Sequence, residues 1–160
     1  MHTTDDPNRV VVRRRIPAPR EVLFEAWTDA EGFRQWMCPG DVVSNEAILD
    51  VRVGGSFRIL MKSKTAEYEH TGVYKIVDPP SKLVFTWTAK ATGDTPTLVT
   101  VEFFAAGEET EIVLTHEKFT DPEVSKRYRG GWGQILEKLS IYQAKRGSTT
   151  RSRSQTFGSN

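Results

Sequence analysis

The sequence predicts an α+β fold in which a seven-stranded antiparallel sheet wraps around a long C-terminal helix. Three patterns lead to this prediction. Between residues 42 and 115, β-branched and aromatic residues alternate with polar ones and are separated by turn signals. Two short helical segments interrupt the strands near the N-terminus, and a long C-terminal helix that begins at Asp121 carries an apolar stripe at helical spacing from Trp132 to Tyr142. The length of 160 residues is typical of one domain.

The first strand is expected at residues 9–16, where a run of valines precedes three arginines. Pro19 suits the first turn of a helix. The apolar stripe of this helix, at a spacing of three to four residues, consists of Val22, Leu23, Ala26 and Trp27. Asp29 is a typical N-cap for a second short helix, which carries Phe33 and Trp36 on one face.

Six further strands are expected at residues 42–51, 56–62, 69–77, 83–89, 97–104 and 111–117. Glycine or proline pairs and Gly-Asp or Ala-Gly steps separate these strands, and each is typical of a reversal. Because successive strands are joined by short turns, the sequence predicts an antiparallel meander.

The alternation also predicts which side chains share the inner face of the sheet, because every second residue of a strand points to the same side. The inner-face residues of three middle strands are Phe57, Ile59, Met61, Leu83, Phe85, Trp87, Val99, Val101 and Phe103. On the last strand, Ile112 and Leu114 take this face and bring His116 inward with them.

The long helix is expected to begin at Asp121, which serves as the N-cap before Pro122 and Glu123. Three glycines weaken its first turns, and the apolar stripe that follows would cover the inner face of the sheet. That stripe consists of Trp132, Ile135, Leu136, Leu139 and Tyr142. The resulting domain spans residues 9–145, between a flexible segment at 1–8 and a disordered, Ser/Thr/Arg-rich tail at 146–160.

Composition and charge exclude several classes of protein. A net charge of +1 provides no field for nucleic acid, and no apolar run reaches the ~18 residues of a membrane span. The single cysteine, Cys38, excludes an internal disulfide and a cysteine-cluster metal site. The three histidines show no zinc spacing, and the glycine pairs lack the order of a nucleotide-binding loop. We therefore expect a cytoplasmic protein without metal, cofactor, nucleic acid or membrane insertion.

The predicted order of one strand, two short helices, six strands and a long helix is that of the helix-grip fold. Eight segments also resemble a family in the same order along residues 9–143: PREVLFEAW (19–27), QW (35–36), DVRVGGSF (50–57), GVY (72–74), VDPP (77–80), LVFTW (83–87), LTH (114–116) and GW (131–132). The chain resembles the START-like (SRPBCC) superfamily, in the branch homologous to the C-terminal domain of the heat-shock protein 90 ATPase activator. The resemblance implies a concave fold with a cavity, whereas reactions and ligands differ among members.

We expect a ligand cavity of about 300–1,000 Å³ between the sheet and the helix at residues 132–142. The residues expected to line it are Trp36, Phe57, Ile59, Met61, Tyr74, Phe85, Trp87, Val99, Val101, Phe103, His116, Trp132 and Leu136. The alternative is that these side chains simply fill the core. Large rigid aromatic rings suit both roles.

His116 is the candidate for proton transfer in such a cavity, with Tyr74 as a second polar group. The alternative is a core histidine whose nitrogens are satisfied by hydrogen bonds. No catalytic residue is assigned, because no carboxylate or nucleophile can be placed beside His116 from sequence. His70 is expected to contribute nothing to any activity.

Three functions remain open from sequence. The leading hypothesis is a protein that carries, sequesters or senses a small hydrophobic or aromatic molecule, such as a lipid or metabolite, in the cavity. The alternatives are a cavity enzyme of the cyclase, dehydratase or hydrolase type, and a chaperone-interaction domain that resembles the heat-shock protein 90 ATPase activator. A homodimer also stays open.

Overall fold

The computed structural model describes residues 7–158, with side chains as far as Arg146. Its seven strands form one antiparallel sheet in the order β1-β7-β6-β5-β4-β3-β2, which confirms the predicted fold class. The elements are β1 (Val10–Ile16), α1 (Arg20–Thr28), α2 (Ala30–Phe33), β2 (Ser44–Leu49), β3 (Ser56–Lys62), β4 (Glu67–Asp78), β5 (Lys82–Ala89), the short 3₁₀ helix η1 (Lys90–Thr92), β6 (Thr97–Ala106), β7 (Glu109–Glu117) and α3 (Pro122–Gly158).

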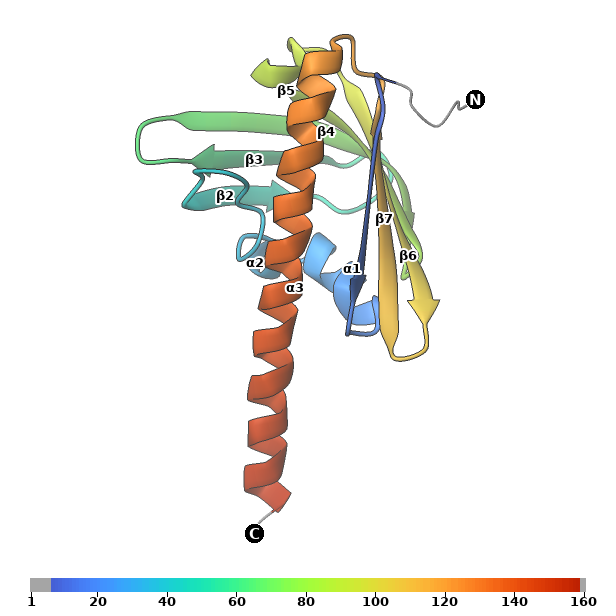
Figure 1. The fold of residues 1–160 in the computed structure, drawn as a ribbon, viewed down its shortest axis with the longest axis vertical. Coiled ribbons are helices and arrows are strands. Elements are labelled where there is room, and N and C mark those ends of the chain that lie inside the picture. The colour runs from blue at the N-terminus through green and yellow to red at the C-terminus, as the bar shows by residue number, and fades with distance from the viewer. Residues whose placement is uncertain (1–6, 159–160) are drawn as a thin grey trace.

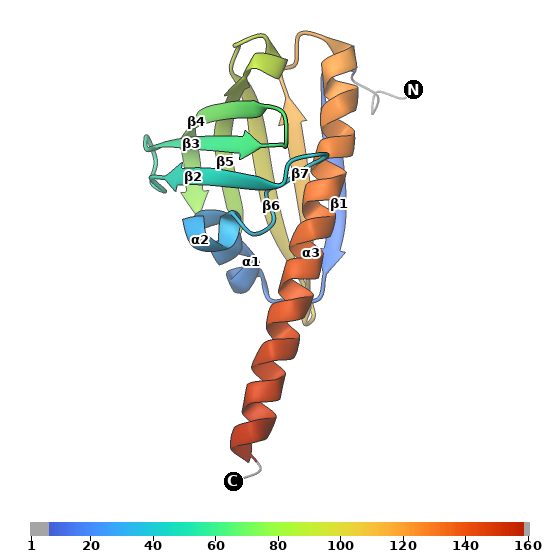
Figure 2. The same ribbon diagram turned by 90° about the vertical axis from the view of Figure 1, so that its left-hand side faces the viewer.

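The sheet curves around α3, which runs along its concave side and projects beyond it at the C-terminal end (Figures 1 and 2). Strands β2 to β7 form a meander, and β1 returns to pair with β7, so the first and last strands are neighbours. The helices α1 and α2 lie at the end of the sheet past which α3 extends (Figure 2). One hydrophobic core is therefore enclosed by the sheet and all three helices.

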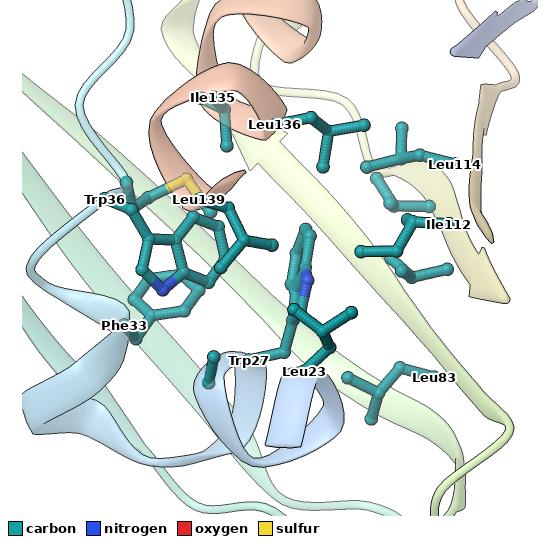
Figure 3. Close-up of a cluster of buried hydrophobic side chains, with 14 of the residues drawn as sticks. Leu23, Trp27, Phe33, Trp36, Leu83, Ile112, Leu114, Ile135, Leu136 and Leu139 are labelled. Carbon is teal, nitrogen blue, oxygen red and sulfur yellow. The ribbon is translucent and has the colours of Figure 1, made fainter. Parts of the chain in front are cut away.

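The predicted inner face is buried throughout. Phe57, Ile59 and Met61 of β3 lie in the core, while Arg58 between them is exposed and pairs with Glu69 on the outside. The core side chains of the sheet meet those of the three helices, as Figure 3 shows for Leu23, Trp27, Phe33, Trp36, Leu83, Ile112, Leu114, Ile135, Leu136 and Leu139. Burial on this scale accounts for the fold, because each large apolar side chain contributes about 1.5–3 kcal/mol.

The second helix is shorter than predicted. α2 has a single turn that ends at Phe33. The Asp29 carboxylate caps its N-terminus by accepting a hydrogen bond from the Gly32 N–H at 3.2 Å. Trp36 lies in the following turn and is nonetheless fully buried, in contact with the rings of Phe33 and Trp27. Trp36 is therefore buried by its packing against Trp27 and Phe33, and not because it lies on the apolar face of a helix.

The chain ends differ from the predicted boundaries in two ways. Residues 1–6 of the segment predicted to be flexible lie outside the described residues, but Pro7 and Asn8 contact the domain through their carbonyl oxygens. α3 continues to Gly158, although a disordered tail is predicted from residue 146. A folded helix end can propagate through Arg, Gln and Ser because each added residue gains a backbone hydrogen bond.

Within the described residues, no helix combines the length and apolar character needed to cross a bilayer, α3 included.

Gly72 of β4 lies where the sheet leaves no room for a side chain. A Cβ atom at this position would lie 2.0 Å from the Thr86 carbonyl oxygen and 2.4 Å from the ring of Phe57. The Phe57 ring therefore occupies the space that any side chain at residue 72 would need.

We predict that Gly72→Ala lowers the free energy of unfolding by ~1–3 kcal/mol, because the added methyl group overpacks a rigid core. Urea denaturation followed by circular dichroism would measure the loss. Gly133→Ala is the matched control, because a Cβ there meets nothing within 4 Å and alanine favours the helix. Equal denaturation midpoints for wild type and Gly72→Ala would contradict the prediction.

Candidate functional site

A cleft of about 760 Å³ lies between the first turns of α3 and strands β3, β4 and β5. Its floor is apolar and consists of buried side chains: Val42, Met61, Trp87, Ala89, Trp132 and Ile135. Its rim is polar and carries six charged residues: Asp41, Glu67, Glu69, Lys90, Asp94 and Arg127. The cleft therefore combines an apolar interior with a polar, solvent-exposed entrance, as small-molecule sites commonly do.

The cleft exists because α3 lacks side chains where it passes over the sheet edge. Gly130 and Gly131 both line the cleft, and a Cβ at Gly131 would come no nearer than 3.9 Å to Pro39 across the opening. Val124, Tyr128 and Gly131 follow one another at helical spacing on this face. Two consecutive residues without side chains thus leave room between the helix and the sheet.

Further along α3 the space is filled. Leu136 and Leu139 are fully buried against the sheet, and only about 10 Å³ remains open around Trp27, Phe57 and Phe85. The cleft therefore flanks α3 from Val124 to Ile135 and overlaps only the first part of residues 132–142, where the sequence predicts the cavity. The side chains of Leu136 and Leu139 fill the space beside the later turns of α3, whereas Gly130 and Gly131 leave the cleft open beside the earlier ones.

His116 sits at the centre of a buried hydrogen-bond chain behind the cleft floor. Trp132 Nε1–H donates to His116 Nδ1 at 2.9 Å. On the other side of the ring, His116 Nε2 lies 2.7 Å from Thr97 Oγ1, and this hydroxyl donates to the Trp87 carbonyl oxygen at 2.6 Å. The chain joins α3 to β7, β6 and β5.

The donors in this chain determine the state of His116. An indole N–H can only donate, so Nδ1 is the acceptor and Nε2 carries the proton that is donated to Thr97. Burial lowers the pKa of His116 to about 3, so the ring is neutral near pH 7. Both ring nitrogens are occupied and the side chain is 0% exposed.

A second hydrogen bond holds the other indole of the floor. Trp87 Nε1–H donates to the Tyr128 hydroxyl at 3.1 Å. Burial raises the pKa of Tyr128, which keeps this hydroxyl protonated. The indoles of Trp87 and Trp132 pack at a centroid distance of 5.3 Å, each tied down at its N–H edge.

His70 lines the cleft and differs sharply from His116. It is 8% exposed, and its ring packs on Trp87 at a centroid distance of 4.9 Å. Its Nδ1 is buried without a hydrogen-bond partner among the described residues. Burial lowers the pKa of His70 to about 4, so this ring is also neutral near pH 7.

The loop after Trp36 closes one side of the cleft. The Gly40 N–H donates to Gln134 Oε1 at 2.6 Å, and Lys138 donates to the Cys38 carbonyl oxygen, so the loop is held against α3. The described residues contain no group of three or more His, Cys, Asp or Glu side chains that could hold a metal ion.

Residues 17–144 match the family model described as Activator of Hsp90 ATPase homolog 1-like protein. The chain belongs to this family. The match spans nearly the whole folded domain and confirms the resemblance stated from sequence. No curated protein matches the sequence significantly.

Solved structures share the helix-grip fold of this family member at low sequence identity. A protein from Chromobacterium violaceum is 20% identical with a TM-score of 0.78, covering 85% of this chain and 96% of its own. A protein from Silicibacter pomeroyi with the family's name is 24% identical with a TM-score of 0.74, covering 86% and 99%. A protein of the dynemicin biosynthetic locus is 19% identical with a TM-score of 0.72, covering 86% and 47%.

In this Hsp90-activator-like chain, the residues expected to line a cavity fall into three groups. Met61, Trp87 and Trp132 line the cleft. Those that border the small inner space are Phe57, Ile59, Tyr74, Phe85 and, from its other side, Trp87. Those that lie in the packed interior outside both spaces are Trp36, Val99, Val101, Phe103, His116 and Leu136.

Sequence reasoning missed the polar residues of the cleft. His70 shares the inner face of β4 with Gly72 and Tyr74, so the alternation applied to the other strands would have placed His70 inward if it had been applied to this strand. Tyr128 lies one helical turn before Trp132, on the same face. Both signals are visible in the sequence, but each depends on where an element begins.

We predict that His116 makes the protein less stable in acid. The unfolded chain takes up a proton at this residue below about pH 6.5 and the folded chain does not until about pH 3. The free energy of unfolding should therefore fall by about 1.4 kcal/mol per pH unit as the pH drops through this window. Urea denaturation of wild type and His116→Gln at pH 7.5, 6 and 5 measures the difference. Identical pH dependence of the two proteins would mean that folded His116 takes up the proton as readily as unfolded His116.

Proposed function

We propose that the chain binds a small, planar, predominantly apolar molecule in the cleft between α3 and the sheet. The observation that carries this proposal is the cleft itself, with a volume of about 760 Å³ and two indoles in its floor. Flat aromatic ligands gain apolar burial against such a floor. Family membership supports the proposal at the level of the fold.

The geometry of His116 favours binding over proton transfer. A general acid or base must reach the substrate and exchange a proton near the working pH. His116 is fully buried, neutral, and bonded at both nitrogens to Trp132 and Thr97. Its role in this proposal is to hold Trp132 in the cleft floor.

A chaperone-interaction domain would need an exposed docking surface instead of a cleft. The exposed apolar side chains Val43, Ile48 and Val53 lie on and beside β2, and none of them lines the cleft. This alternative stays a prediction, and it is separable from the proposal because changes inside the cleft would leave that surface intact.

We predict that Gly131→Leu weakens ligand binding at least tenfold, because a leucine on this face of α3 projects towards Pro39 and fills the opening. Nile red, an uncharged planar dye, serves as the probe, and its fluorescence titration should give saturable one-to-one binding to wild type. Gly133→Leu is the matched control, since Gly133 lies outside the cleft and a Cβ there meets nothing within 4 Å.

Two results would contradict the proposal. One is the absence of saturable binding to the wild-type chain. The other is equal weakening by Gly131→Leu and Gly133→Leu, which would place the dye outside the cleft. Thermal midpoints of both variants must match or exceed that of wild type, as the loss of helical glycine leads us to expect.

A further inference from the structure

His70 has an unmet hydrogen-bonding capacity inside the cleft. It is more than nine-tenths buried, and its Nδ1 has no partner in the described part of the chain. His116 provides the contrast, because both of its nitrogens are bonded. Because His70 lines the cleft, a ligand that hydrogen-bonds to its ring gains affinity.

Tyr128 offers a second polar group beside the same indole. Its hydroxyl oxygen accepts from Trp87 Nε1, and among the described residues the hydroxyl donates to none. The O–H of Tyr128 is therefore available to a ligand. His70 packs on the Trp87 ring at 4.9 Å, so both polar groups flank one aromatic side chain of the floor.

The charges of the rim determine what kind of polar ligand group fits. The cleft is lined by Asp41, Glu67 and Asp94, which carry carboxylates, and by Lys90 and Arg127, which carry positive charges, while the Glu69 carboxylate pairs with Arg58 on the outer face. His70 is neutral and offers no positive charge. An anionic group would thus meet a net negative rim, while an uncharged group would not.

We infer that the cleft takes an aromatic molecule that bears an uncharged hydroxyl group, which His70 and Tyr128 bind beside Trp87. A hydroxyl both donates and accepts, so it can pair with a ring nitrogen of His70 in either neutral tautomer and accept from the Tyr128 hydroxyl. This inference rests on the proposed function and adds the chemical class of the ligand.

Three probes of similar shape test the inference: 2-naphthol, 2-methylnaphthalene and 2-naphthoate. Their binding to the full chain is measured by isothermal titration calorimetry with the protein in the syringe. We expect 2-naphthol to bind about 5–10-fold more tightly than 2-methylnaphthalene, the worth of one net hydrogen bond, and 2-naphthoate to bind most weakly.

Two variants test whether His70 and Tyr128 cause the preference for 2-naphthol. His70→Phe keeps a ring against Trp87 without the nitrogens, and Tyr128→Phe removes only the hydroxyl. Each should reduce the preference for 2-naphthol over 2-methylnaphthalene, because one of its two hydrogen-bond partners remains, and leave the affinity for 2-methylnaphthalene unchanged. Tyr142→Phe is the matched control, because it removes a hydroxyl from α3 outside the cleft, where Arg146 donates to it.

The outcomes separate the two proposals. If 2-naphthol and 2-methylnaphthalene bind equally, or if 2-naphthoate binds most tightly, the hydroxyl inference fails while the proposed function stands. If none of the probes binds wild type, the proposed function fails and the inference fails with it. If His70→Phe does not fold, Tyr128→Phe alone decides, and an unchanged preference for 2-naphthol in that variant overturns the inference.

Discussion

The hydrogen-bond chain from Trp132 through His116 and Thr97 to the Trp87 carbonyl is the constraint on which the rest of the structure depends. It is buried, every donor in it has an acceptor, and it ties α3 to three neighbouring strands. In the low dielectric of the core, a broken member would leave an unpaired polar group. The chain therefore determines how α3 is rotated on the sheet, and with that rotation it directs Gly131 and Tyr128 towards the cleft.

Core and site share their most important side chains. Trp87 and Trp132 are almost fully buried and pack against the rest of the core, yet both form part of the cleft floor. A ligand in the cleft would thus meet a surface held rigid by the folding core, with little ordering left to be done on binding. The two buried histidines differ in their hydrogen bonds. Both ring nitrogens of His116 have partners within the protein, whereas His70 Nδ1 has none among the described residues.

The low identity to solved structures bears on how the function must be argued. Structures only 18–24% identical share this fold with TM-scores of 0.74–0.78. Alternating apolar residues and a covering helix are enough to specify such an architecture, and many different side chains satisfy that pattern. The shared fold therefore provides a scaffold, and the ligand must be inferred from the residues that this chain places in the cleft.

Sequence alone predicted the order of the elements along the chain, the inner face and the inward direction of His116, because period-two alternation and capping signals are local properties of the chain. The pairing of β1 with β7 is a long-range contact that such signals do not encode. Tertiary structure alone decided that Leu136 and Leu139 fill one half of the space under α3 and that glycines leave the other half open. It also decided that His116 is fully paired while His70 Nδ1 is not. The short length of α2 likewise depends on core packing. The extent of α3 depends on the backbone hydrogen bond that each added helical residue gains. These features arise where residues distant in sequence meet, and no spacing along the chain encodes such contacts.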